Sequence, residues 1–234
     1  MPNLKVRWNR FANSRAGTAD YLTLTSSHHS LTRALLPLIE RYARGRVLDL
    51  GSGYGTYRPP LQVRSSLYVG LDIEHKSRSL DLIADGRRLP FAVNTFDTVF
   101  SSQVLEHTPE PWCLLGEVQR VLAPGGALIL SAPHLSYVHA APEDYYRYTN
   151  FGLAFLLQQA GFEQVEVHPA GGLLSLLGSV PPTVYLALLP EKPAGFVNAV
   201  LWLNRWVSRF FVALDDRLDR GKLFALNFIA IARK

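Results

Sequence analysis

The residues best suited to chemistry lie between Arg46 and Gly55, in the sequence RVLDLGSGYG. Gly51, Gly53 and Gly55 fall within five positions, and glycine lets a backbone turn tightly and approach a ligand closely. Asp49 interrupts the apolar run before them, which is unexpected in a purely structural strand. A strand that ends in a glycine loop and leads into a helix forms a small-molecule site at its carboxyl end.

Two further aspartates, Asp72 and Asp85, lie at the ends of predicted strands. Asp49 and Asp72 are separated by 23 positions, about one strand–helix–strand unit. A carboxylate at the end of the second strand can accept hydrogen bonds from a ribose diol, and a third acid could accept from an adenine amino group. Each aspartate alone is equally well explained as a solvated loop residue or cap. The three together, behind a glycine loop, favour a nucleoside-like ligand.

The glycine spacing separates two classes of cofactor. The dinucleotide fingerprint G-x-G-x-x-G requires a glycine at position 56, where this sequence has Thr56. A nicotinamide-dependent oxidoreductase is therefore disfavoured and is kept as the enzymatic alternative. The non-enzymatic alternative is a cofactor-binding or membrane-docking module.

Two further segments accompany the glycine loop. SSQVLEHTPEP spans residues 101–111, and VLAPGGALILSAP spans residues 121–133. With RVLDLGSGYG, they resemble the class I S-adenosylmethionine-dependent methyltransferases of the small-molecule type, over about residues 30–170. The resemblance implies an α/β fold with a Rossmann-like, doubly wound, seven-stranded sheet. That sheet would be mostly parallel, with an antiparallel last strand between the fifth and sixth, and the cofactor would be S-adenosyl-L-methionine.

The resemblance also implies roles for individual residues. Gly51 and Gly53 would pass beneath the methionine part of the cofactor, with Asp49 at its amino end. Asp72 would hold the ribose hydroxyls, and Asp85 with the backbone of Gly86 would address the adenine. Ser101 and Gln103 would lie near the sulfonium and the acceptor. We also assign Ser52 and Ile73, which neighbour these positions, to the cofactor site.

The candidate catalytic residues are His107, His139 and Tyr145. Methyl transfer needs a base only if the acceptor carries a proton that must leave. His107 follows the fourth predicted strand, and its structural alternative is a histidine that caps or packs. The segment from His139 to Thr149 would contribute to the acceptor pocket, or alternatively form a turn in which Asp144 pairs with Arg147.

We assign no metal ligand from the sequence. A set formed by His134, His139 and Glu143 is conceivable from residue types alone, and nothing further in the sequence supports it.

The predicted elements bring these residues to one edge of the sheet, because the carboxyl ends of parallel strands lie together. An N-terminal arm or lid over 1–29 precedes a methyltransferase domain over 30–234, which carries a helical apolar insert at about 170–222. The predicted helices span 30–44, 111–122 and 150–160. The predicted strands span 46–50, 67–73, 81–85, 96–101, 127–131, 164–168 and 226–232.

The insert leaves three alternatives open: a helical cap that buries its apolar face, a homodimer interface or acceptor lid, and peripheral contact with a membrane. The formal net charge of +5 is spread along the chain, so no nucleic-acid partner is expected. The single cysteine, Cys113, and the lack of a signal-peptide pattern favour a cytoplasmic protein, membrane-associated if the insert docks. The expected acceptor is a small or lipid-linked molecule.

Overall fold

The computed structural model describes residues 3–77, 80–189 and 193–234. The chain divides into two compact units. The sheet unit contains residues 35–169 and 227–234, and the helical unit contains residues 1–34 and 170–226. The N-terminal arm and the insert, which are far apart in the sequence, therefore belong to one unit.

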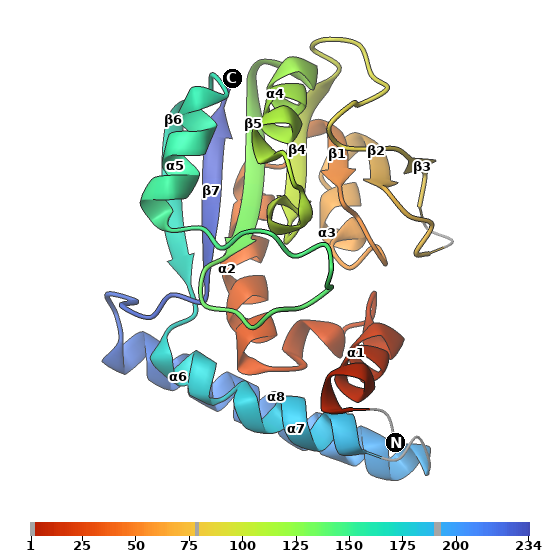
Figure 1. Ribbon diagram of the computed structural model, residues 1–234, viewed down its shortest axis with the longest axis vertical. Coiled ribbons are helices and arrows are strands. Elements are labelled where there is room, and N and C mark those ends of the chain that lie inside the picture. The colour runs from red at the N-terminus through yellow and green to blue at the C-terminus, as the bar shows by residue number, and fades with distance from the viewer. Residues whose placement is uncertain (1–2, 78–79, 190–192) are drawn as a thin grey trace. The chain divides into compact units, whose positions relative to one another are not determined.

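The sheet unit is built on a seven-stranded sheet in the order β3-β2-β1-β4-β5-β7-β6. The pairs β1–β2, β1–β4, β2–β3 and β4–β5 are parallel, and β7 is antiparallel to β5 (Figure 1). The predicted Rossmann-like fold with an antiparallel last strand is confirmed. The strands are β1 (Gly45–Leu50), β2 (Ser65–Asp72), β3 (Leu82–Ile83), β4 (Phe96–Ser102), β5 (Leu122–Pro133), β6 (Glu163–Ala170) and β7 (Asn227–Arg233).

Helices cover both faces of this sheet. In Figure 1, α4 (Pro111–Val121) and α5 (Asn150–Gln159) lie in front of the sheet, and α3 (Arg58–Gln62) lies behind it. The α4 helix buries Leu114, Leu115, Val118 and Val121, which recur at helical spacing and so form one apolar face. The hydroxyl of Thr149 caps α5 by accepting a 3.0 Å hydrogen bond from the Gly152 N–H.

The largest boundary differences from the sequence prediction are at the starts of α2 and β5. The α2 helix runs from Ser26 to Tyr42, so it begins four residues earlier than predicted and continues through Pro37. The β5 strand begins at Leu122 rather than at residue 127, because Pro124-Gly125-Gly126 is accommodated in a register shift against β4. Gly125 adopts a φ of +74°, which a glycine tolerates within such a bulge.

The helical unit contains a helix within the segment that the sequence predicted as an N-terminal arm or lid. The α1 helix (Leu4–Arg15) begins at Asn3, whose side chain accepts a 3.0 Å hydrogen bond from the Val6 N–H. The other helices are α6 (Leu173–Leu177), α7 (Val180–Leu188) and α8 (Ala194–Leu218), together with residues 26–34 of α2. Their core contains Trp8, Leu24, Leu186, Ala187, Val197 and Leu201.

The α8 helix buries a side that mixes apolar and polar residues, with Val197, Leu201 and Val212 on the apolar part. Its buried residues include Asn204, Ser208 and Asp215, whereas Trp202, Leu203, Trp206, Phe210 and Leu218 are more than half exposed. Hydrogen bonds make this burial tolerable, because the Asn204 oxygen accepts from the Tyr185 hydroxyl and the Asp215 carboxylate accepts from α6. The apolar stripe that the sequence predicted on α8 therefore faces outward along much of the helix.

Candidate cofactor and acceptor site

The glycine loop after β1 has one position that only glycine fits and one that leaves open space. A Cβ atom on Gly51 would overlap the side chain of Val104, and the φ of +77° is in the left-handed region. A Cβ atom on Gly53 would meet nothing closer than 4.0 Å. The loop is therefore packed at its base and open at Gly53, where a ligand can approach the backbone.

The end of β2 holds this loop in place. The N–H groups of Gly51 and Ser52 both donate to the Leu71 carbonyl oxygen, at 2.8 and 3.0 Å. The carboxylate of Asp72 accepts a 2.9 Å hydrogen bond from the Gly53 N–H. Asp72 is only 5% exposed. Its role at the ribose hydroxyls stays a prediction, and the carboxylate would have to accept those hydrogen bonds while keeping its bond to Gly53.

Asp49 is a buried carboxyl group without a bonded cation among the described residues. It is 2% exposed, and its Oδ2 accepts a 2.7 Å hydrogen bond from the hydroxyl of Tyr68. Burial raises the pKa of Asp49 to about 7, although the hydrogen bond from Tyr68 opposes the shift. A positively charged ligand group would favour the ionised form. Sequence reasoning missed Tyr68, which ordinary alternation along β2 does not distinguish from a packing residue.

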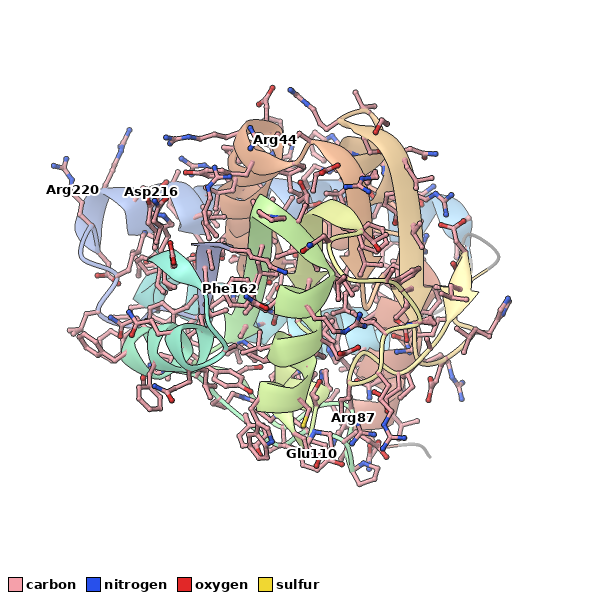
Figure 2. The ribbon with its side chains drawn as sticks, turned by 90° about the horizontal axis from the view of Figure 1, so that it is seen from above. Arg44, Arg87, Glu110, Phe162, Asp216 and Arg220 are labelled. Carbon is pink, nitrogen blue, oxygen red and sulfur yellow. The ribbon has the colours of Figure 1, made fainter. Side chains whose placement is uncertain are left out.

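Asp85 is already engaged by a neighbouring arginine. The guanidinium of Arg87 approaches both carboxylate oxygens, with its Nη2 at 2.7 Å from Oδ2, and this ion pair lowers the pKa of Asp85. Arg87 also pairs with Glu110 at 2.7 Å, and the two are labelled side by side in Figure 2. The backbone of Gly86 packs tightly, because a Cβ atom there would lie 3.2 Å from Leu50 Cδ1.

The end of β4 contributes two of the predicted residues. The hydroxyl of Ser101 is buried and has no hydrogen-bond partner among the described residues. Gln103 adopts an uncommon φ of +57°, its N–H donates to the Ser131 carbonyl oxygen at 3.0 Å, and its side chain contacts the Ser131 hydroxyl at 3.3 Å. Ile73, at the end of β2, is 61% exposed. Their roles at the cofactor stay predictions.

The loop over residues 134–149 is fixed to the turn after β4. The N–H of Tyr145 donates to the Glu106 carbonyl oxygen at 2.9 Å, and the buried Tyr148 donates from its hydroxyl to the Leu105 carbonyl oxygen at 3.1 Å. Within the loop, Arg147 pairs with Asp144 at 2.6 and 2.8 Å. The alternative in which these two residues form a structural pair is therefore observed, and it braces the loop.

These contacts bring two of the predicted catalytic residues together. The rings of His107 and His139 are nearly perpendicular, with centroids 4.9 Å apart. The structural alternative for His107, a histidine that caps or packs, is also compatible with its position, because its Nδ1 lies 2.5 Å from the Glu143 carbonyl oxygen. Burial lowers the pKa of His107, so the imidazole is neutral near pH 7. Tyr145 is 48% exposed, and its ring contacts Tyr146.

Glu106 completes this cluster, and the sequence analysis did not single it out. Its carboxylate has no exposed surface, and its Oε1 lies 3.7 Å from His107 Nε2. Burial raises the pKa of Glu106 to about 8. An acid next to a histidine was visible in the sequence, but an acid at a turn is ordinarily solvated. His134, considered above as a metal ligand, instead packs its ring against Phe228.

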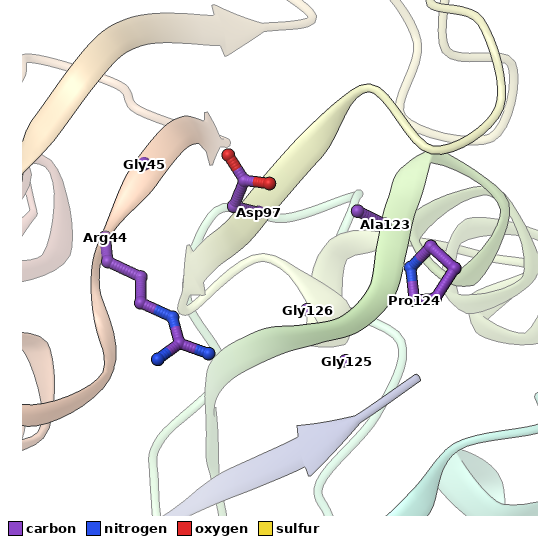
Figure 3. A pocket seen from close by; sticks show the side chains of 7 residues that line it. All are labelled: Arg44, Gly45, Asp97, Ala123, Pro124, Gly125 and Gly126. Atoms are coloured by element: carbon purple, nitrogen blue, oxygen red, sulfur yellow. The ribbon is translucent and has the colours of Figure 1, made fainter.

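A surface hollow of about 240 Å³ lies at the other edge of the sheet (Figure 3). It is formed at the amino ends of β1 and β4, away from the glycine loop. Asp97 projects there, but its carboxylate accepts hydrogen bonds from the backbone and side chain of Arg46. The lining residues are Arg44, Gly45, Asp97, Ala123, Pro124, Gly125 and Gly126, and they offer no second candidate catalytic site.

Comparisons with known proteins agree with this geometry. The family described as "Methyltransferase domain" matches residues 48–130, which include the glycine loop and the turn after β4. Together with the seven-stranded fold, this match supports the resemblance to the class I S-adenosylmethionine-dependent methyltransferases over these residues. An uncharacterized methyltransferase of Mycobacteroides abscessus is 37% identical over 103 residues, which span 38% of this chain and 40% of that protein.

Solved structures share this fold at low sequence identity. A SAM-dependent methyltransferase from Archaeoglobus fulgidus is 19% identical with a TM-score of 0.58, covering 87% of this chain and 93% of that chain. The [4+2]-cyclase SpnF is also 19% identical with a TM-score of 0.58, covering 87% and 81% of the two chains. The fold is therefore shared by proteins with different reactions, so the reaction must be argued from the site.

Within residues 3–77, 80–189 and 193–234, no helix has both the length and the apolar character needed to span a bilayer.

Proposed function

We propose that the protein transfers a methyl group from S-adenosylmethionine to an oxygen, nitrogen or carbon atom of a small or lipid-linked acceptor. The observation that carries this proposal is the open cradle at Gly53 beside two buried carboxyl groups, Asp49 and Asp72. A ligand that carries both an ammonium group and a ribose diol would suit these two acids. A nicotinamide dinucleotide offers no ammonium for Asp49, and Thr56 replaces the glycine that its fingerprint requires.

The residues present fit this cofactor. Among the described residues, the buried carboxyl of Asp49 forms no ion pair and the Ser101 hydroxyl has no hydrogen-bond partner, and Gly53 leaves room at the backbone. Asp49 would hold the amino end, Asp72 the ribose hydroxyls, and the segment from Asp85 to Gly86 the adenine. When bound, the cofactor supplies a methyl group on a sulfonium, which is a good leaving group.

The protein would contribute mainly alignment and exclusion of water. Orienting two reactants can supply roughly 7–11 kcal/mol of a barrier. The loop over 134–149 is braced by Asp144 and Arg147 and tied to the turn after β4, so it can hold an acceptor in a fixed position. His107 and His139 would handle the proton that an oxygen or nitrogen acceptor releases, with Tyr145 on the exposed side of the pocket.

Replacing Asp72 tests the cofactor site. Asp72→Ala removes the proposed ribose acceptor and the bond to the Gly53 N–H, so affinity for S-adenosylmethionine and S-adenosylhomocysteine should fall at least about tenfold. Isothermal calorimetry measures both. Asp97→Ala is the matched control, because its ion pair with Arg46 lies at the other sheet edge. Wild-type protein that gives no binding heat with either ligand would contradict the proposal.

Turnover distinguishes a methyltransferase from the non-enzymatic alternative and from other reactions on this fold. Binding without production of S-adenosylhomocysteine across alcohols, phenols, amines and acids would favour a binding module. A fluorescence titration with NADH tests the oxidoreductase alternative, because only an oxidoreductase of this kind is expected to bind NADH.

We also propose that the helical unit docks on a membrane that contains anionic lipid. Its exposed apolar side chains follow two rows, Leu177, Val180, Val184 and Leu188 on α6 and α7, and Phe196, Trp202, Leu203, Trp206 and Phe210 on α8. Tryptophan and phenylalanine on one side of an amphipathic helix are typical of helices that lie in a membrane interface. This surface would suit a lipid-linked acceptor, since such an acceptor is held in the bilayer.

The charge distribution favours lipid over a second copy of the chain. The helical unit carries 11 lysines and arginines and 5 acidic residues, a formal net charge of +6, whereas the sheet unit carries −1. Like-charged units repel each other in a homodimer, while anionic headgroups attract a basic one.

Vesicle co-sedimentation tests this docking. Wild-type protein should bind phosphatidylcholine vesicles that contain phosphatidylglycerol more tightly than vesicles of phosphatidylcholine alone. Trp206→Ala with Phe210→Ala should weaken binding at least about tenfold, since each aromatic side chain contributes about 1.5–3 kcal/mol on burial. The control is Phe151→Ala with Phe155→Ala, which removes two exposed phenylalanines from α5. If the α8 variant instead loses only self-association, measured by sedimentation velocity, the surface is a dimer interface.

A further inference from the structure

A buried carboxylate faces an imidazole on the acceptor side of the site. Glu106 has no exposed surface, and neither of its carboxylate oxygens accepts a hydrogen bond from the residues that the structure describes. Such a group is costly, because an ionised carboxylate that has lost its water needs another source of positive charge. The group therefore requires either a proton or a cation.

The orientation of His107 favours a cation. Its Nδ1 lies 2.5 Å from the Glu143 carbonyl oxygen, which can only accept, so Nδ1 carries the proton and Nε2 presents a lone pair. That Nε2 lies 3.7 Å from Glu106 Oε1, too far for a direct hydrogen bond. Two acceptors thus face each other across a gap. An imidazole whose other nitrogen donates to a backbone carbonyl is the usual arrangement of a histidine metal ligand.

His139 supplies a third ligand. Its Nδ1 lies 3.1 Å from the Tyr137 carbonyl oxygen, which again leaves Nε2 as the lone-pair nitrogen. Arg147 Nη2 approaches the same Nδ1 only at 3.5 Å, and this guanidinium is bonded to Asp144 at shorter distances. One ligand atom each from Glu106, His107 and His139 lies within 4.8 Å of the others.

We propose that Glu106, His107 and His139 together bind one divalent first-row transition-metal ion. Two imidazoles and one carboxylate suit Zn²⁺, Mn²⁺, Fe²⁺ or Co²⁺ better than Mg²⁺ or Ca²⁺, which prefer oxygen ligands. Ligand atoms around a tetrahedral metal at about 2.1 Å lie about 3.4 Å apart, so the side chains must close by about 1.5 Å at most. His139 lies in the loop over 134–149, which has no helix or strand.

The ion would bind the methyl acceptor, which is the part of this inference that rests on the proposed function. A hydroxyl oxygen of the acceptor would occupy a remaining coordination position. A divalent ion lowers the pKa of a bound hydroxyl, whose proton then leaves to solvent without a protein base. The two imidazoles therefore act as ligands when the ion is present. This assigns the acceptor to the class of hydroxyl compounds, with O-methylation as the reaction.

Cobalt binding tests the site directly, without S-adenosylmethionine. Tag-free protein is treated with a chelator and titrated with Co²⁺, whose visible absorption reports nitrogen and oxygen ligation, and Zn²⁺ is then added as a competitor. Wild-type protein should bind one Co²⁺ per chain, and Glu106→Gln, His107→Asn and His139→Asn should each weaken binding at least about tenfold. His134→Asn is the matched control, because this histidine lies in the same loop but packs against Phe228.

Glu106→Gln also separates lost binding from lost folding. Glutamine has the shape of a protonated glutamate, so the melting temperature of the metal-free variant should not fall, while the rise that Zn²⁺ gives wild-type protein should disappear. The metal site is overturned if wild-type protein binds no stoichiometric Co²⁺. It is also overturned if the three ligand variants bind as tightly as wild type, or if His134→Asn loses as much affinity as they do.

Calorimetry with S-adenosylhomocysteine on the same metal-free samples separates the two proposals. Cofactor binding without cobalt binding contradicts the metal site alone. Cobalt binding without cofactor binding contradicts the proposed function alone.

Discussion

At the scale of single residues, Asp49 combines burial with a position at the end of β1. Its pKa is raised from an ordinary 3.8 to about 7, mainly by burial. The folded protein therefore binds a proton more tightly than the unfolded chain does. The stability that Asp49 contributes is complete below about pH 4, and it is lost as the pH rises through about 7. For this buried group the loss is at most about 4 kcal/mol.

Asp49 should make both stability and cofactor affinity depend on pH. The melting temperature of ligand-free protein should fall between about pH 4 and 7, and Asp49→Asn should flatten that slope. An ammonium group favours the ionised carboxylate, so affinity for S-adenosylhomocysteine should rise through about pH 7 with proton uptake by the buffer. Calorimetry in buffers of different ionisation enthalpy measures that proton. Identical pH profiles for wild type and Asp49→Asn would show that Asp49 does not titrate.

At the scale of elements, Asp215 connects two helices of the helical unit. This α8 residue is completely buried, and its carboxylate accepts hydrogen bonds from the Leu174 N–H at 3.1 Å, the Ser175 N–H at 3.3 Å and the Ser175 hydroxyl at 2.6 Å. These groups belong to the first turn of α6, which is only five residues long. A helix this short has few bonds of its own, so its stability depends on this contact.

Removing the Asp215 carboxylate should destabilise α6. Asp215→Ala leaves buried donors unpaired and should cost about 2–4 kcal/mol, measured by urea unfolding and by faster amide exchange over residues 173–177. Asp216→Asn is the control, because that aspartate is partly exposed and its ion pair with Arg33 should contribute at most about 1 kcal/mol. If the two variants lose the same free energy of unfolding, the buried hydrogen bonds of Asp215 contribute no more to stability than the surface ion pair does.

At the scale of the whole molecule, charge and apolar exposure are unevenly distributed between the units. The helical unit has a formal net charge of +6 and exposed aromatic residues on α8, and the sheet unit has a net charge of −1 and the glycine loop. We therefore expect vesicle binding to weaken with added salt, because electrostatic attraction is screened. Added salt should change the affinity for the cofactor far less, because Asp49 and Asp72 are buried.

Local sequence patterns were sufficient to predict the sheet and the glycine loop at the carboxyl end of β1. Apolar runs that end in Gly51–Gly55 and Asp72 are local patterns, and local sequence is enough to predict a strand and a turn. The antiparallel place of β7 came with the family resemblance and is confirmed. Boundaries failed where tertiary contacts decide them, as at the start of β5, which pairs with β4 through a register shift.

The cluster around Glu106 and the buried side of α8 could not be predicted from local sequence patterns. Glu106 and His139 are separated in the sequence, and they meet because the loop over 134–149 is hydrogen-bonded to the turn after β4. The amphipathic sequence pattern of α8 predicts an apolar side and a polar side, but it does not specify which residues are buried. The buried side carries Val197, Leu201 and Val212 together with Asn204 and Asp215, whose polar groups are hydrogen-bonded. Burial depends on the partner that an element meets, and a local pattern does not specify that partner.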